Sequence, residues 1–443
     1  MKNIELDRRD FIKSAVGFAA LAAMPSAILA EEPEADSRRN IVLIMADDIG
    51  YECFGANGGT SYKTPILDKM AETGARFEYC YSQPVCTPSR VKIMTGIYNV
   101  RNYKCFGVMD RTQTTFAHLL KKAGYATCVA GKWQLGHEVD SPKHFGFDES
   151  CLWQHIRKRT DEEEHDTRYS NPKLEVNGEP VDYNNGEYGP DVVSDFACDF
   201  MGRNKDKPFL VYYPMILTHS PFCPTPDSKD WDPKSKGSKE YIGKPEYFGD
   251  MVTYMDKMVG KITAKLDELG LRDKTLVMFI GDNGCDRKIE SMLNGQKVRG
   301  GKKGMGDNGT HTVFIAQCPG TVKEGIVSKD LVDFSDFLPT MCEATGTAVP
   351  VELNIDGRSF LSQLKGQKGN PRDWAYCYFK NQAWARTQRY KLYNNGKFCE
   401  VSNGKESVVA DVDNPDEETK KVHAMLQAVH KRYYKAPRPE RKK

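Results

Sequence analysis

The sequence predicts an α/β fold with a large mixed, mainly parallel sheet sandwiched by helices. Four short apolar segments alternate with segments of helical periodicity, and runs this apolar are typical of strands covered on both faces. The C-terminal part differs, because its alternating pattern and an Asn-Asn-Gly turn predict a smaller antiparallel sheet followed by a terminal helix.

The predicted elements follow one another along the chain. Helical patterns at 115–123 and 251–269 precede the second and fourth apolar runs, and two polar stretches, 154–185 and 224–244, are expected to be loops. This order predicts a catalytic domain at 38–370 and a C-terminal subdomain at 371–443. The four strands are expected at 41–45, 125–130, 209–213 and 276–280, the small sheet near 383–396 and the terminal helix at 416–434.

The N-terminus resembles an export signal. Arg8 and Arg9 are followed by Phe11, Lys13 and an alanine-rich apolar run at 14–30. We interpret 1–30 as a twin-arginine signal, with an amphipathic opening helix as the alternative. The signal implies the twin-arginine translocation machinery as a partner and a periplasmic or secreted location.

The composition excludes some classes of protein. With 443 residues, 28% charged residues and a net charge of +2, the chain has an ordinary globular composition and no basic footprint for nucleic acid. Nothing beyond the N-terminus is long and apolar enough for a stable membrane span. The 13 cysteines are scattered, so they predict no disulfide pairing, and no Cys-x-x-Cys pair indicates a zinc site.

Each apolar run is followed by chemically useful side chains. In α/β sheets, ligands bind beyond the carboxyl ends of the strands, so these groups are expected to converge on one site. In chain order they are Asp47 and Asp48, Lys132, His219, and Asp282 with Asn283.

Four of these side chains predict a metal site. Asp47, Asp48, Asp282 and Asn283 offer hard oxygen ligands, which suit Ca²⁺, or Mg²⁺ if the cage is tight and hydrated. No cluster of histidine and cysteine joins them, which disfavours zinc. The alternative is that both motifs are only helix caps and turns.

Cys86 has an unusual context. Thr87 fits an N-cap and Pro88 the first helical position, so Cys86 is expected just before a helix that carries Arg90. From the residues alone this is either an activated thiolate near a helix dipole or a buried structural cysteine.

The segment Cys86-Thr87-Pro88-Ser89-Arg90 resembles the maturation signature of type I formylglycine-dependent sulfatases of the alkaline phosphatase superfamily, in which this cysteine becomes formylglycine. The resemblance extends over essentially the whole mature chain. Further matching segments lie at 47–50, 64–65, 95–96, 123–125, 131–133, 146–148, 281–284, 299–302, 337–340 and 386–392.

The resemblance implies an activity and a role for each site residue. The enzyme would hydrolyse sulfate esters, with a sulfated carbohydrate as the expected substrate and a formylglycine-generating enzyme as the maturation partner. Arg90 would hold the formylglycine hydrate, Lys132 and Lys302 would clamp sulfate oxygens, and His219 would face the leaving oxygen. The metal shell would be Asp47, Asp48, Asp282, Asn283 and the modified Cys86.

Two departures from the family pattern affect the chemistry. Gln134 stands where the family usually has a histidine that assists release of sulfate, and glutamine cannot act as a base. Either Gln134 only orients the hydrate, or His137 or His311 takes the proton. After Lys302, the segment 307–309 also differs, which leaves specificity open.

Three other functions remain open from the sequence. A phosphoester or phosphonate-ester hydrolase of the same superfamily would share the metal ligands. A non-catalytic protein that binds sulfated glycans would explain Gln134, although it would need no formylglycine signature. A cysteine hydrolase would use Cys86 directly with a paired histidine and no metal.

Overall fold

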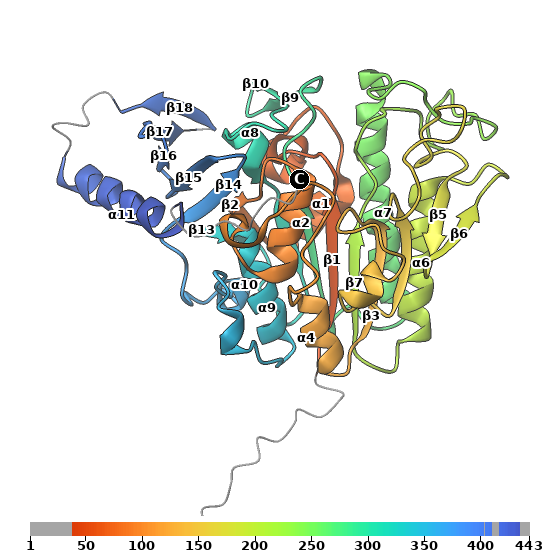
Figure 1. Ribbon diagram of the computed structural model, residues 1–443, viewed down its shortest axis with the longest axis horizontal. Coiled ribbons are helices and arrows are strands. Elements are labelled where there is room, and N and C mark those ends of the chain that lie inside the picture. The colour runs from red at the N-terminus through yellow and green to blue at the C-terminus, as the bar shows by residue number, and fades with distance from the viewer. Residues whose placement is uncertain (1–37, 403, 410–415, 435–443) are drawn as a thin grey trace, which may run out of the picture.

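The computed structural model describes residues 38–402, 404–409 and 416–434, and a mixed sheet of 11 strands runs through its centre (Figure 1). The strand order is β11-β2-β12-β8-β1-β7-β3-β4-β5-β6, and β13 pairs with β2. The central strands β8, β1, β7, β3 and β4 are parallel, whereas β12 and the β5–β6 edge are antiparallel. This confirms the predicted α/β class.

The bounds of the strands are as follows. The large sheet contains β1 (Asn40–Ala46), β2 (Ala75–Tyr81), β3 (Ala126–Lys132), β4 (Glu149–Trp153), β5 (Lys173–Val176), β6 (Glu179–Asp182), β7 (Phe209–Pro214), β8 (Thr275–Gly281), β11 (His311–Thr312), β12 (Phe314–Gln317) and β13 (Ile326–Asp333). A hairpin is formed by β9 (Glu290–Leu293) and β10 (Gln296–Arg299), and the small sheet by β14 (Ala375–Phe379), β15 (Gln382–Arg386), β16 (Tyr390–Tyr393), β17 (Phe398–Ser402) and β18 (Lys405–Val408).

The helices are mostly short. The α-helices are α1 (Pro65–Glu72), α2 (Cys86–Thr95), α3 (Asn99–Asn102), α4 (Phe116–Lys122), α5 (Ser141–His144), α6 (Gly189–Arg203), α7 (Phe248–Glu268), α8 (Asp307–Thr310), α9 (Phe337–Ala344), α10 (Leu361–Leu364) and α11 (Glu417–Tyr433). The 3-10 helices are η2 (Tyr51–Cys53), η3 (Gly55–Asn57), η4 (Pro245–Tyr247), η5 (Phe334–Asp336) and η6 (Val351–Leu353).

Both faces of the large sheet are covered, which explains the continuously apolar strands. Val42 and Ile44 of β1 pack into one core together with α6 and α7, whereas Ile41 and Leu43 pack into the opposite core with α2, α4 and α9. All seven residues of β1 are buried. A strand covered on both faces gains from apolar side chains at every position.

All four predicted strands of the large sheet are present, but the sequence pattern did not predict the strands at the β5–β6 edge. Part of the polar stretch 154–185, predicted to be a loop, forms β5 and β6 and extends the sheet. β6 reads Glu-Pro-Val-Asp and is mostly exposed. An exposed edge strand does not need the apolar pattern that identifies a central one.

The C-terminal prediction is confirmed. β14 to β18 form an antiparallel sheet, and α11 packs Leu426 and Val429 against Leu392 and Phe398 of that sheet. The proposed export signal at 1–30 lies outside the described residues. Among the described helices, none is long and apolar enough to cross a membrane.

Lys92 of α2 connects the helix after Cys86 to the strands beside it. Its ammonium donates to the Asp333 carboxylate and to the Tyr376 carbonyl, each at 2.7 Å, and both charged side chains are fully buried. Breaking a buried ion pair by removing one partner is costly.

We therefore expect Lys92→Met to lower the free energy of unfolding by about 3–5 kcal/mol, because Asp333 would remain buried without its cation. Chemical denaturation measures this change. Lys69→Met is the matched control, since Lys69 pairs with Glu72 on the surface and its loss should change little. Equal losses for the two variants would contradict the analysis.

Candidate active site

The carboxyl ends of β1 and β8 bring four predicted ligands together. These strands are adjacent and parallel, so the residues that follow them meet at one edge of the sheet. The Asp48 amide donates to Asp282 Oδ1 at 3.0 Å, and Asn283 Nδ2 donates to Asp48 Oδ1 at 2.8 Å. Asp47, Asp48, Asp282 and Asn283 are all buried.

Local backbone geometry places these groups. Asp48 has φ of 58°, a left-handed conformation that asparagine and aspartate tolerate better than most residues and that turns the chain sharply after β1. Gly131 has φ of 131°, and a Cβ there would lie 1.9 Å from the carbonyl oxygen of Pro214. Only glycine therefore lets the end of β3, which carries Lys132, approach β7 this closely.

Three buried cations face the three carboxylates. Lys132 Nζ lies 2.6 Å from Asp47 Oδ2, and Lys302 donates to Asp48. Arg90 donates to Asp282 at 3.2 Å and to the carbonyl of Lys132 at 2.9 Å. The carboxylates and the cations balance in charge, which makes their burial tolerable.

The carboxylates nevertheless differ in acidity. Burial opposes ionisation of Asp47, but the positive charges of Lys132 and Arg90 lower its pKa below the ordinary value. Burial, followed by the negative charge of Asp47, raises the pKa of Asp282 well above the ordinary value. Asp282 is thus the carboxyl that gains most from a further cation.

Among the buried side-chain oxygens without a hydrogen-bond partner, two belong to predicted metal ligands. These are Asp47 Oδ1 and Asn283 Oδ1. In addition, a carboxylate oxygen of Asp47, one of Asp282 and the sulfur of Cys86 all lie within 4.8 Å of one another. Buried oxygens without partners around such a centre fit the donor set of a hard divalent cation.

Cys86 is the first residue of α2, not the residue before it. Val85, with extended φ and ψ, occupies the cap position, so the predicted N-cap role of Thr87 is wrong. Thr87 Oγ1 instead accepts a hydrogen bond from the Gly107 amide at 3.1 Å. Ser89 fixes the helix start to the metal ligands by donating to the Asp282 carbonyl at 2.6 Å.

The Cys86 thiol is fully buried. Burial is the main influence on its acidity, and it raises the pKa of Cys86 above the ordinary value despite nearby Lys132. Of the two alternatives that the sequence left open, this favours the buried cysteine over the activated thiolate. The cysteine hydrolase hypothesis loses its main support.

His219 lies on the other side of the cluster. Its Nε2 is 3.1 Å from Lys302 Nζ and 3.5 Å from Asp48 Oδ2. Burial, followed by the charges of Lys302 and Lys132, holds its pKa well below the ordinary value. The neutral ring is positioned to exchange a proton or a hydrogen bond with a group bound between Lys302 and Asp48.

Arg168 is a further residue of the site that the sequence did not reveal. Its NH1 lies 2.7 Å from His219 Nδ1, and its guanidinium forms two hydrogen bonds to Asp166, at 2.8 and 2.9 Å. It also stacks 4.0 Å from the Trp153 ring centre. Because the Ser220 carbonyl lies 2.6 Å from the same Nδ1, the ring is held with Nε2 facing Lys302.

Gln134 follows Lys132 by two residues, whereas the two alternative bases are engaged elsewhere. Gln134 is buried, has φ of 57°, and its Oε1 has no hydrogen-bond partner. His137 Nδ1 lies 2.9 Å from the His155 carbonyl. His311 stacks on Tyr51 with 4.1 Å between ring centres. Burial lowers the pKa of His311 to about 4, so it is neutral near pH 7.

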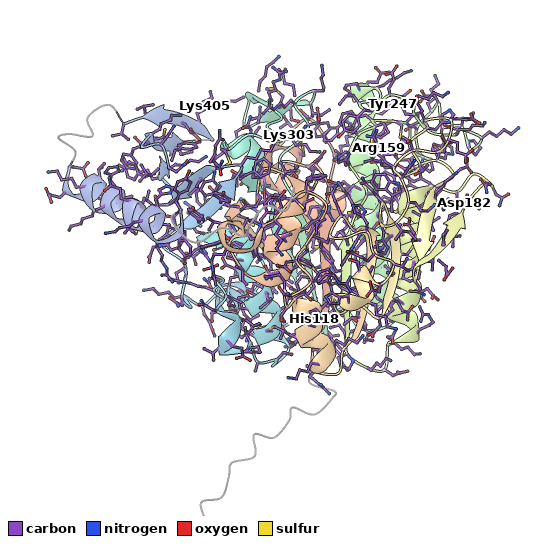
Figure 2. The ribbon with its side chains drawn as sticks, viewed as in Figure 1. His118, Arg159, Asp182, Tyr247, Lys303 and Lys405 are labelled. Carbon is purple, nitrogen blue, oxygen red and sulfur yellow. The ribbon has the colours of Figure 1, made fainter. Side chains whose placement is uncertain are left out.

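A large cavity lies apart from this cluster. It measures about 1260 Å³ and is lined by η2, β2, the β9–β10 hairpin and the small sheet, with His311 and Arg386 in its wall. None of the predicted metal ligands lines it. Lys303, next to Lys302, lies toward the end of the molecule where the parallel strands terminate, and His118 lies toward the opposite end (Figure 2).

Comparison with known proteins places this arrangement in a family. The family model described as Sulfatase matches residues 39–347. The chain belongs to the sulfatase family. It is therefore a sulfuric ester hydrolase of the alkaline phosphatase superfamily, as its Cys-Thr-Pro-Ser-Arg segment predicts.

Relatives and solved structures agree with this assignment. The N-acetylgalactosamine-6-sulfatase of Homo sapiens is 30% identical over 426 residues, which cover 82% of this chain and 75% of the relative. An arylsulfatase of Hemicentrotus pulcherrimus is 28% identical, covering 80% and 67%. Among solved structures, BT4656 in complex with its substrate D-glucosamine-2-N,6-O-disulfate aligns with a TM-score of 0.72 at 20% identity, covering 91% of this chain and 100% of that one.

The contact between Arg168 and His219 generates a testable prediction for this sulfatase. We expect Arg168→Lys to lower kcat by about tenfold or more while KM changes little, because lysine cannot hold Asp166 and the His219 ring together. Initial rates of sulfate release measure both parameters. Arg203→Lys is the matched control, since Arg203 pairs with Glu149 and Asp199 on the surface. An unchanged kcat in Arg168→Lys would contradict the positioning role.

Proposed function

We propose that this sulfatase is calcium-dependent and removes sulfate from carbohydrate esters through a formylglycine made from Cys86. One observation carries the proposal, namely that Cys86 shares a buried centre with the carboxylates of Asp47 and Asp282. The names of the relatives support the substrate class, because they include an N-acetylgalactosamine-6-sulfatase. The structure with a bound glucosamine disulfate supports it as well.

Calcium is the metal that this donor set favours. Asp47, Asp48, Asp282 and Asn283 would hold it with oxygen atoms, and the modified Cys86 would complete the shell. Mg²⁺ would require a smaller and more hydrated cage. When bound, the ion would act as a Lewis acid toward the nucleophile and the sulfate group.

The modification explains why a cysteine stands at this position. A formylglycine-generating enzyme would convert Cys86 to an aldehyde, whose hydrate offers one hydroxyl to attack sulfur and a second to release sulfate afterwards. Arg90 would hold that hydrate, since its guanidinium lies beside Asp282 and is fully buried. A serine would supply only one hydroxyl and would remain sulfated.

The remaining cations would act on the sulfate group. With the metal bound to Asp47 and Asp48, the ammonium groups of Lys132 and Lys302 would be free to bind sulfate oxygens. There they would offset the negative charge that develops in the transition state. His219, oriented by Arg168, would support the leaving oxygen. Gln134 would orient the hydrate through its amide but could not exchange a proton.

The location of the protein remains a proposal too. The twin-arginine pattern at Arg8 and Arg9 supports export by the translocation machinery to the periplasm or the medium. The division into a catalytic domain at 38–370 and a C-terminal subdomain at 371–443 likewise remains a prediction.

A phosphonate or phosphoester hydrolase is the second candidate. A phosphonate monoester hydrolase of Agrobacterium radiobacter aligns with a TM-score of 0.64 at 19% identity, covering 89% of this chain and 96% of that one. This likeness concerns the fold alone. Relative rates on sulfate and phosphate esters of one alcohol separate the two activities, and the proposal expects sulfate to be preferred.

The proposed function predicts that the protein, made in a host able to form formylglycine, releases inorganic sulfate from one or more members of a panel of sulfated mono-, oligo- and polysaccharides. Release should vanish in Cys86→Ala, because this variant lacks the residue that would carry the nucleophile. It should also vanish when calcium is chelated, because the ion that would activate the nucleophile is removed. Cys86→Ser should give at most one turnover.

The mass of the peptide that contains Cys86 shows whether this residue has been converted to formylglycine. If Cys86 is fully converted and no panel member releases sulfate, the carbohydrate sulfatase proposal is wrong, and phosphoester hydrolysis or glycan binding takes its place. If Cys86→Ala retains full activity, the nucleophile has been misassigned.

A further inference from the structure

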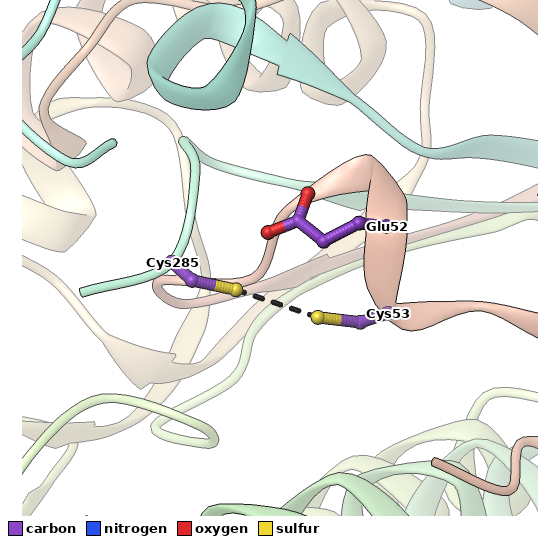
Figure 3. Close-up of side chains that lie close together, drawn as sticks. All are labelled: Glu52, Cys53 and Cys285. Atoms are coloured by element: carbon purple, nitrogen blue, oxygen red, sulfur yellow. Dashed lines mark hydrogen bonds between the residues drawn. The ribbon is translucent and has the colours of Figure 1, made fainter. Parts of the chain in front are cut away.

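A second buried cluster lies on the two loops that also carry the candidate calcium ligands. Figure 3 shows the sulfur atoms of Cys53, at the end of η2, and Cys285, after β8, pointing toward one another with the Glu52 carboxylate beside them. The two sulfurs are 3.4 Å apart. A carboxylate oxygen of Glu52 and both sulfurs lie within 4.8 Å of one another.

The Glu52 carboxylate is the unusual member of this cluster. Its residue is only 3% exposed, and its Oε1 has no hydrogen-bond partner. No ion pair of Glu52 with a lysine, arginine or histidine is found among the described residues. Burial raises the pKa of this carboxyl although Cys285 hydrogen-bonds to it, and its unpartnered oxygen is one that a bound cation would satisfy.

The sulfur environment also suits a bound cation. Burial raises the pKa of the Cys285 thiol well above the ordinary value, and the Gly50 amide, which donates a hydrogen bond to Cys285 Sγ at 3.2 Å, partly opposes this rise. The Glu52 carboxylate covers the Gly50 backbone so closely that a Cβ at Gly50 would lie 2.2 Å from it. Glycine at this position therefore leaves room for the carboxylate to reach the two sulfurs.

We propose that Glu52, Cys53 and Cys285 bind a thiophilic divalent cation of the Zn²⁺ class. Two thiolates and one carboxylate are ligands that such ions accept, whereas Ca²⁺ and Mg²⁺ prefer oxygen alone. Binding releases the two thiol protons to solvent, and no electron is transferred. The site is chemically distinct from the all-oxygen set at Asp47, Asp48, Asp282 and Asn283.

A disulfide accounts for fewer of the observations. The sulfurs are farther apart than the ~2.05 Å of an S–S bond. A disulfide is also neutral, so it would leave the Glu52 oxygen without a partner. A cation satisfies the carboxylate and both sulfurs at once.

The position of the cluster gives the ion a structural role. Gly50 lies two residues after Asp48, and Cys285 lies two residues after Asn283. An ion held by Glu52, Cys53 and Cys285 would therefore connect the two loops that carry the hard-oxygen ligands.

Titration of the full chain with Cd²⁺, in saturating Ca²⁺ and a phosphine reductant, tests this proposal without using sulfatase activity. The expected result is about one bound Cd²⁺ per chain with an ultraviolet thiolate-to-metal charge-transfer band. Cys53→Ser and Cys285→Ser should lose the band, and Glu52→Gln should weaken binding by about tenfold or more. Cys105→Ser, at an exposed cysteine, is the matched control and should bind normally.

Three results would overturn the proposal. They are no charge-transfer band in the full chain, a band that persists in folded Cys53→Ser, or a Cys53–Cys285 disulfide in peptides of protein prepared without reductant. Circular dichroism establishes whether each variant folds. If the serine variants do not fold, Glu52→Gln and the full chain decide the matter.

Discussion

The site depends on a balance of buried charge at the carboxyl ends of the central strands. Asp47, Asp48 and Asp282 are fully buried, and Arg90, Lys132 and Lys302 offset their charge. Without the cations the carboxylates could not remain ionised in this interior. A divalent ion added to this balanced set leaves an excess of two positive charges, which favours binding of a sulfate group.

The fold supplies the members of this balance from several elements. Parallel pairing of β1 with β7 and β8 brings the ends of three strands to one edge, and β3 adds Lys132 beside them. Arg90 arrives from α2, whose start is fixed by the hydrogen bond from Ser89 to the Asp282 carbonyl. The rigid sheet thus positions groups that are far apart in the sequence.

The sequence predicted the parts of the structure whose local pattern has a single physical cause. β1 and β8 were predictable because burial on both faces demands apolar residues throughout. β2 was missed because its partly exposed sequence, Ala-Arg-Phe-Glu-Tyr-Cys-Tyr, mixes charged and apolar residues. Local propensity also failed at Thr87, because a tertiary contact with Gly107 uses its hydroxyl.

The clustering of the predicted metal ligands could be foreseen because each follows an apolar strand, but the supporting residues could not. Arg168 lies in a polar segment with no strand pattern strong enough to mark it, and only the folded chain brings it to His219, 51 positions away. The pairing of Cys53 with Cys285 likewise spans 232 positions. Such contacts follow from sheet topology, which a local pattern does not specify.

Calorimetric titration of the full chain with Ca²⁺, beside an Asn283→Leu variant, tests the central claim most directly. Leucine keeps the side-chain volume and removes the amide oxygen that has no partner. We expect one Ca²⁺ per chain in the native protein and binding weaker by about tenfold or more in the variant. Equal affinity in both, or no binding by the native protein, would contradict the assignment of this buried cluster as the metal centre.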